Sequence, residues 1–155
     1  KASDSEVKQA HGMIDDLASD HPLLIERCSE FTADRGYDDG KLMVKLWDEY
    51  EIKPVIDIRN CWQDPDPTKL LGNYTNVAHD YKGTIYCYCP NDGTQREMAF
   101  AGFEKDRGTL KYRCPARQYG ISCTGHNHCS VATGIRIKLK KDRADLPRNL
   151  FFTKI

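Results

Sequence analysis

The segment from residue 28 to residue 59 constrains the fold most, because two short strand patterns flank one helical pattern. Residues 28–33 predict a strand, which Gly36 ends. Apolar side chains then recur at helical spacing from 42 to 50. Residues 55–58 form a second, β-branched run after Pro54. A strand, a helix and a strand in this order make a right-handed crossover, so we expect the two strands to be parallel.

Asp34 stands at the end of the first predicted strand, where the chain turns toward the helix. Ligands of open α/β sheets bind outside the carboxyl ends of the strands. Asp34 is therefore the first candidate ligand for Mg²⁺ or Mn²⁺, since such ions are held by one or two carboxylates that leave room for water and phosphate. The alternative is that Asp34 caps the following helix. Asp38 and Asp39 fit a helix N-terminus better than catalysis, and Asp57 could face the same crevice as Asp34.

Five of the seven cysteines fall between residues 87 and 129, with two histidines in the last interval. An odd number of cysteines argues against a fully paired disulfide framework. Thiolate and imidazole are the ligands that Zn²⁺ prefers in closed tetrahedral sites. The predicted zinc ligands, which stand at turns, are Cys89, Cys114, Cys123 and Cys129. Cys87 could replace Cys89, and His126 and His128 are held in reserve. Free thiols and disulfides are the alternatives.

The chain after residue 59 changes character. Residues 60–81 contain prolines, glycine and few apolar residues, and predict a linker loop. Residues 82–141 predict a β-rich insertion with a strand at 84–89, a turn at 90–93 and a hairpin that pairs 97–103 with 110–113. The expected organisation is a core at 1–59, the loop at 60–81, the cysteine-rich insertion at 82–141 and a return segment at 142–155.

A basic stripe follows the last predicted strand, in which Ile135, Ile137 and Leu139 alternate with cations. Its members are Arg136, Lys138, Lys140, Lys141 and Arg143. Such a stripe suits contact with nucleic-acid phosphates. A solvated strand face is the competing interpretation, because the chain carries 23 acidic and 23 basic residues and has no net charge.

The expected cellular setting is cytoplasmic and reducing, which suits metal-bound thiolates. No apolar run approaches the roughly 20 residues that a membrane span needs, so we expect no membrane partner. The first 20 residues are polar at helical spacing and do not resemble a signal peptide. The absence of an initiator Met suggests an excised or processed fragment.

The motif ADRGYD at 33–38, followed by an amphipathic helix and KPVIDIR at 53–59, resembles the second-aspartate segment of insertion-sequence DDE transposases. The resemblance continues through RGTLKYRCP at 107–115 to Cys123 and Cys129, and the four predicted zinc ligands match the cysteine pattern of that family. It implies an α/β fold: a partial ribonuclease-H-like βαβ core with an inserted β-rich, cysteine-rich subdomain, in which zinc is the ligand that we expect from the cysteines themselves. Asp34 then matches the middle carboxylate of an Asp-Asp-Glu triad. The first aspartate is expected before residue 1 and the glutamate helix after residue 155.

The resemblance implies metal-dependent cleavage and transfer of DNA strands, with Mg²⁺ or Mn²⁺ as cofactor and DNA as partner. Two of the three acids are expected outside the chain, so residues 1–155 are expected to be inactive alone. A homo-oligomer is left open. The alternative function is a zinc-stabilised nucleic-acid-binding module without catalysis, and a third is a degenerate remnant with only a structural existence.

Overall fold

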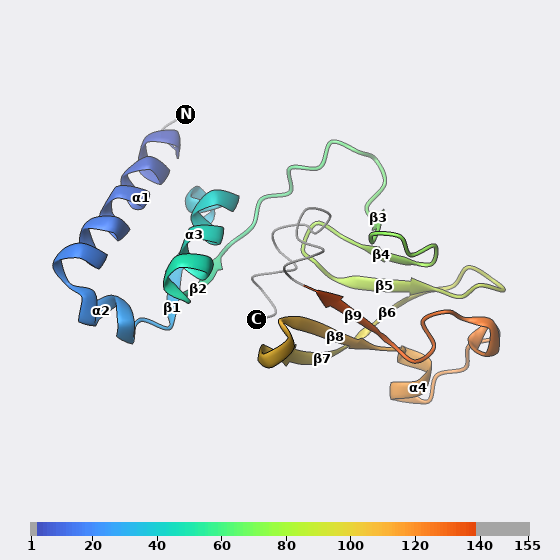
Figure 1. Ribbon diagram of the computed structural model, residues 1–155. Helices are drawn as coiled ribbons and strands as arrows, with labels where there is room; N and C mark the ends of the chain where they lie inside the picture. The colour runs from blue at the N-terminus through green and yellow to red at the C-terminus, as the bar shows by residue number, and fades with distance from the viewer. Residues whose placement is uncertain (1–2, 139–155) are drawn as a thin grey trace. The chain divides into compact units, whose positions relative to one another are not determined.

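The computed structural model describes residues 3–138 of the chain (Figure 1). The chain divides into two compact units, residues 1–59 and residues 60–155. The fold is mixed α/β, and the described residues form three separate sheets of two, four and three strands. The expectation of an α/β chain is therefore confirmed at this level.

The first unit contains the predicted strand–helix–strand crossover. Its elements are α1 (Ser3–Asp20), α2 (Pro22–Arg27), β1 (Glu30–Ala33), the 3₁₀ turn η1 (Arg35–Tyr37), α3 (Gly40–Tyr50) and β2 (Lys53–Ile56). Strands β1 and β2 pair in parallel, with Ala33 opposite Ile56, which confirms the predicted direction. The apolar run at 23–25 is too short to assign from the sequence, and it lies in α2. This helix begins at Pro22, where the missing N–H of proline costs no helical hydrogen bond.

The core of the first unit forms between α1, α3 and β2. Its fully or nearly buried side chains are Ala10, Ile14, Leu42, Met43, Leu46, Ile52 and Ile56. The helices α1 and α3 lie side by side (Figure 1), and the Lys45 ammonium and the Tyr50 hydroxyl both donate to Asp15. The apolar stripe of α3 is therefore buried in this core through Leu42, Met43 and Leu46, as the periodicity of 42–50 predicts.

The second unit begins with a sheet of four short antiparallel strands in sequence order. They are β3 (Lys69–Leu70), β4 (Val77–His79), β5 (Ile85–Tyr88) and β6 (Gln95–Glu97). β3 and β4 lie inside the predicted linker loop 60–81. Strands of two or three residues are too short to show an alternation of apolar and polar side chains, so the sequence did not predict them. In the structure β3 pairs with β4, and β4 pairs with β5.

A three-stranded antiparallel sheet follows, formed by β7 (Ala99–Glu104), β8 (Thr109–Arg113) and β9 (Ile135–Lys138). The predicted hairpin is confirmed, because β7 pairs with β8 across the turn η2 (Lys105–Arg107). The predicted alternation is also confirmed, since Ile135 and Ile137 are buried while the two cations between and after them are exposed. The helix α4 (Pro115–Tyr119) and the turn η3 (His126–His128) connect β8 to β9.

Candidate functional site

Asp34 lies directly after β1, in an extended conformation, and its side chain is exposed. Its Oδ1 accepts a 2.7 Å hydrogen bond from the backbone N–H of Gly36. Asp34 is thus the N-cap of the short turn η1, while Asp39 caps α3 by accepting from the N–H of Leu42 at 2.8 Å. The capping interpretation of Asp34 is confirmed for η1. Its role as a metal ligand stays a prediction.

Gly36 leaves room for the Asp34 side chain in this turn. A Cβ at position 36 would lie 2.8 Å from Asp34 Oδ1, closer than such atoms approach in proteins. The same position would be 3.9 Å from Oε2 of Glu6, so the turn after β1 brings a carboxylate of α1 near that of Asp34. Helix α1 therefore adds an acid to this edge that the strand pattern alone does not predict.

Asp57 follows β2 as Asp34 follows β1, so both acids lie at the carboxyl edge of the parallel pair. Nε and Nη2 of Arg35 donate to Asp57 Oδ2 at 2.9 and 2.6 Å. Arg59 lies at the same edge, where its Nε–H donates to the carbonyl oxygen of Arg35 at 2.8 Å. Because the Arg35 guanidinium already compensates the charge of Asp57, Asp34 is the better candidate for an ion at this edge.

Five of the six thiols of the second unit surround one small cavity. Its metal-ligand-type lining residues are Cys87, Cys89, Cys114, Cys123, His126 and Cys129. The cavity holds about 10 Å³, which corresponds to one water molecule or one ion. Within residues 3–138, which include all seven cysteines, no disulfide is formed. His128, the other reserve ligand, is exposed and does not line the cavity.

Hydrogen-bond donors are directed at four of these five sulfur atoms. The backbone N–H groups of Asn91 and Asp92 lie where they favour the thiolate of Cys89, and that of Gly125 lies where it favours the thiolate of Cys123. Asn76 Nδ2 donates to Cys129 Sγ at 3.3 Å. The remaining pair is Cys114 Sγ and His126 Nδ1, 3.8 Å apart, in which the ring nitrogen is the donor in one tautomer. Such donors stabilise a thiolate over a thiol.

The thiols differ in acidity for physical reasons. The hydroxyl of Thr124, 3.4 Å from Cys89 Sγ, and the two backbone donors lower the pKa of Cys89. Burial and, to a smaller extent, the neighbouring thiols raise the pKa of Cys87 to about 11. Burial and the adjacent Cys89 also raise the pKa of Cys123. Cys89 and Cys87 were interchangeable from the sequence, and the structure separates them by their hydrogen-bond donors.

Two turns press against each other beside this cavity. A Cβ on Gly125 would come within 2.6 Å of Pro90 Cγ and 2.7 Å of its Cδ. Asn91 Nδ2 donates to the carbonyl of Thr124 at 2.9 Å. The turn after Cys89 and the turn after Cys123 are therefore fixed together, and with them the two sulfur atoms.

No three His, Cys, Asp or Glu side chains within residues 3–138 converge, as they stand, on a point where a metal ion could bind. Asp34, with Glu6 of α1 near it, offers a partial ligand set for a hard cation. The six residues around the thiol cavity have the right chemistry for Zn²⁺, and the donors described above are already in place.

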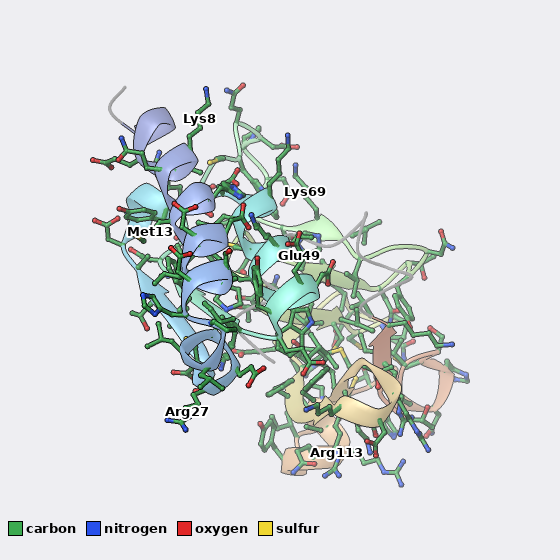
Figure 2. All side chains as sticks on the ribbon, turned by 60° about the vertical axis from the view of Figure 1, so that its left-hand side comes forward. Lys8, Met13, Arg27, Glu49, Lys69 and Arg113 are labelled. Carbon is green, nitrogen blue, oxygen red and sulfur yellow. The ribbon has the colours of Figure 1, made fainter. Side chains whose placement is uncertain are left out.

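The outer face of the three-stranded sheet is cationic. Arg136 and Lys138 are exposed on β9, and Lys111 of β8 stands opposite Arg136 in the register. Arg113, labelled in Figure 2, is two residues further along β8. Because side chains alternate along a strand, it lies on the same face as Lys111. Glu104 accepts from Arg136 Nε at 3.0 Å, which reduces the charge of this face. The predicted Lys140, Lys141 and Arg143, and the return segment 142–155, lie outside the described residues.

Sequence reasoning missed the residues that support these groups. Asn76 and Thr124 were not singled out, because a hydrogen bond to a sulfur 53 or 35 positions away leaves no local pattern. Lys111 and Arg113 could have been found, since they alternate with the buried Leu110 and Tyr112 along β8.

No family model, no curated protein and no solved structure matches this chain. Among residues 3–138, none of the helices combines the length and the apolar character that crossing a bilayer requires.

Proposed function

We propose that this chain is part of a DDE transposase with a ribonuclease-H-like core, an enzyme that cuts DNA strands and joins them to new sites. The observation that carries the proposal is the position of Asp34, at the carboxyl end of a strand in a parallel β–α–β crossover. Ligands of such sheets gather at this edge. In the family that the sequence resembles, the aspartate of the ADRGYD motif is the middle carboxylate of the metal-binding triad.

The proposed role of Asp34 is ligation of Mg²⁺ or Mn²⁺. A pair of divalent ions about 3.5–4 Å apart, when bound, supplies an activated water or 3′-hydroxyl and stabilises the leaving oxygen. Asp34 is exposed and so accessible to an ion, while its Oδ1 keeps the turn in place by accepting from Gly36. One carboxylate is too few for two ions, so residues 1–155 alone are expected to bind them weakly and to cut no DNA.

Binding of an ion at Asp34 can be tested in this chain with Mn²⁺, whose unpaired electrons broaden nearby NMR signals. We expect broadening of the amide signals of residues 33–36 in the wild type and its loss in Asp34→Asn. The amide oxygen of asparagine still caps η1, so the variant removes the charge and keeps the turn. Asp16→Asn, an exposed acid of α1, is the matched control. Equal broadening in the wild type and Asp34→Asn would contradict the proposal.

The enzymatic step is tested in a version of the protein extended at both ends. We expect divalent-dependent nicking of duplex DNA that Asp34→Asn abolishes and Asp16→Asn preserves. Nicking that survives Asp34→Asn would remove this residue from the site. A longer version that folds, binds DNA and never nicks it would favour the degenerate remnant.

The cationic face of the three-stranded sheet favours a second function, a zinc-stabilised module that binds nucleic acid without catalysis. Among residues 3–138, this face carries the cations Lys111, Arg113, Arg136 and Lys138 and the acid Glu104. Phosphate contacts by such cations make affinity fall with salt.

If the second function is correct, residues 1–155 should bind duplex DNA with an affinity that falls as the salt concentration rises. Fluorescence anisotropy should show weaker binding for the double variant Lys111→Glu and Lys138→Glu, with the slope of log affinity against log salt reduced by about one per lost contact. Lys8→Glu with Lys41→Glu, two exposed cations of the first unit, is the matched control. Identical slopes in both variants would exclude this face. Sedimentation of the same samples tests the open prediction of a homo-oligomer.

A further inference from the structure

We propose that the thiol cavity of the second unit binds one Zn²⁺ ion through the thiolates of Cys89, Cys114, Cys123 and Cys129. Cys87 and His126 line the same cavity without serving as ligands. The site is structural, and it is independent of Asp34 and of any activity on DNA.

The size and the lining of the cavity support a single ion. A volume of about 10 Å³ excludes a small organic ligand and admits one ion. Four sulfur ligands at about 2.3 Å give the closed tetrahedral coordination that is typical of structural zinc. Binding requires the thiolates to turn inward, since the side chains do not converge on one point as they stand.

The choice of four ligands rests on the donors that surround the cavity. Metal-bound ligands are held by hydrogen bonds from a surrounding layer of residues. Each chosen sulfur has such a partner: backbone N–H groups for Cys89 and Cys123, Asn76 for Cys129 and the His126 ring for Cys114. Within the described part of the chain, no donor of this kind faces Cys87. His126 therefore acts as a donor to a ligand, and Cys87 as a buried neighbour.

The positions of the turns make the same assignment. The N–H groups that reach Cys89 come from the second and third residues after it, and the N–H that reaches Cys123 comes from the second. Gly125 and Pro90 pack these turns against each other, so the backbone positions of Cys89 and Cys123 are fixed relative to each other. Arg96 also lines the cavity and is anchored by donating Nη2 to the carbonyl of Ser122 at 2.9 Å. A guanidinium at this place offsets part of the excess negative charge of four thiolates around Zn²⁺.

Zinc content and thiol protection test the proposal on residues 1–155. Elemental analysis should give about one zinc per chain. With zinc bound, alkylation followed by mass spectrometry should leave the four ligands unmodified, while Cys61, which is exposed outside the cavity, is modified. Chelation should then expose the four thiols. A folded chain purified without zinc that takes up none when Zn²⁺ is added, or a disulfide between any two of the four, would overturn the proposal.

Variants test the choice of ligands. Cys123→Ser and Cys129→Ser should lose the zinc, whereas Cys87→Ser, Cys61→Ser and His128→Ala should keep it. Cobalt substitution gives an independent count, because sulfur-to-cobalt charge-transfer bands grow with the number of thiolate ligands. A band intensity for fewer than four thiolates, or loss of zinc in Cys87→Ser, would overturn the assignment.

A ligand variant could fail to fold, so a second test leaves all ligands in place. Asn76→Ala removes the donor to Cys129 and should lower zinc affinity 10- to 100-fold in competition with a chelator. Asn73→Ala, an exposed residue of the same loop, is the matched control and should leave the affinity unchanged. Equal affinities for the two variants would contradict the role given to the surrounding donors.

Discussion

The two units of this chain differ in where their candidate metal ligands lie: on the surface in the first unit and around a cavity in the second. In the first unit, α1, α3 and β2 bury aliphatic side chains, and the acids after β1 and β2 are exposed. In the second unit, the strands are two to six residues long, and the ligand-type side chains are gathered around an interior cavity. Both units also bury apolar side chains, among them Leu46 in the first and Ile85 and Leu110 in the second. We expect the proposed zinc to stabilise the loops of the second unit in addition to its apolar core.

Removing zinc is the strongest way to break this comparison. Structural zinc in small domains contributes apparent binding free energies of about 10–16 kcal/mol to folding. We expect a chelator to abolish hydrogen-exchange protection in β5, β8 and the turns between them, and to leave α1 and α3 protected. Exchange measured by mass spectrometry on the whole chain reports both units in one experiment. Uniform loss of protection, or none, would contradict the division.

A core truncation should affect the first unit in the opposite sense. Leu46 is fully buried on α3, so Leu46→Ala should lower the free energy of unfolding by about 2–5 kcal/mol. Leu23 is 66% exposed, and Leu23→Ala should change it by less than about 0.5 kcal/mol. Urea denaturation followed by helix circular dichroism measures both. Similar effects of the two variants would show that the apolar core is not what holds this unit.

Two glycine variants sharpen the comparison further. Gly125→Ala places a methyl group against Pro90 and should cost about 1–3 kcal/mol through overpacking, together with loss of zinc affinity. Gly12→Ala meets no atom within 4 Å, and it should stabilise α1 by up to about 1 kcal/mol. Thermal unfolding of each variant with zinc present gives the signs. A neutral Gly125→Ala would mean that the two turns can separate without cost.

The smallest effect concerns acid stability in the second unit. Hydrogen bonds from Arg136 and Thr109 lower the pKa of Glu104 from its usual value near 4.5 to about 2. Because the pKa is lower in the folded state, this contribution is fully present above about pH 4.5 and is lost as the pH falls toward 2.

In Glu104→Gln the unfolding midpoint should therefore depend less on pH between 4.5 and 2 than in the wild type. Asp106→Asn, an exposed acid of the neighbouring turn, is the control. The expected difference is small, because the pair lies at the surface and solvent screens it. Parallel pH profiles for the wild type and Glu104→Gln would show that the ion pair does not form in solution.

The sequence by itself determined the features that depend on local periodicity. Helical spacing at 42–50 between two short runs gave the parallel crossover, and alternation at Ile135 and Ile137 gave the buried face of β9. Turn residues at 90–93 placed the bend after β5. In each case the pattern repeats within a few residues, because one element needs one apolar face.

Only the tertiary structure decided which distant groups meet. It paired Arg35 with Asp57, placed Asn76 beside Cys129, and formed β3 and β4 from a segment that reads as a loop. It also separated His126 from His128, although both lie in the same short turn. Such contacts join residues tens of positions apart, and their free energy depends on the packing of the folded chain rather than on any nearby spacing.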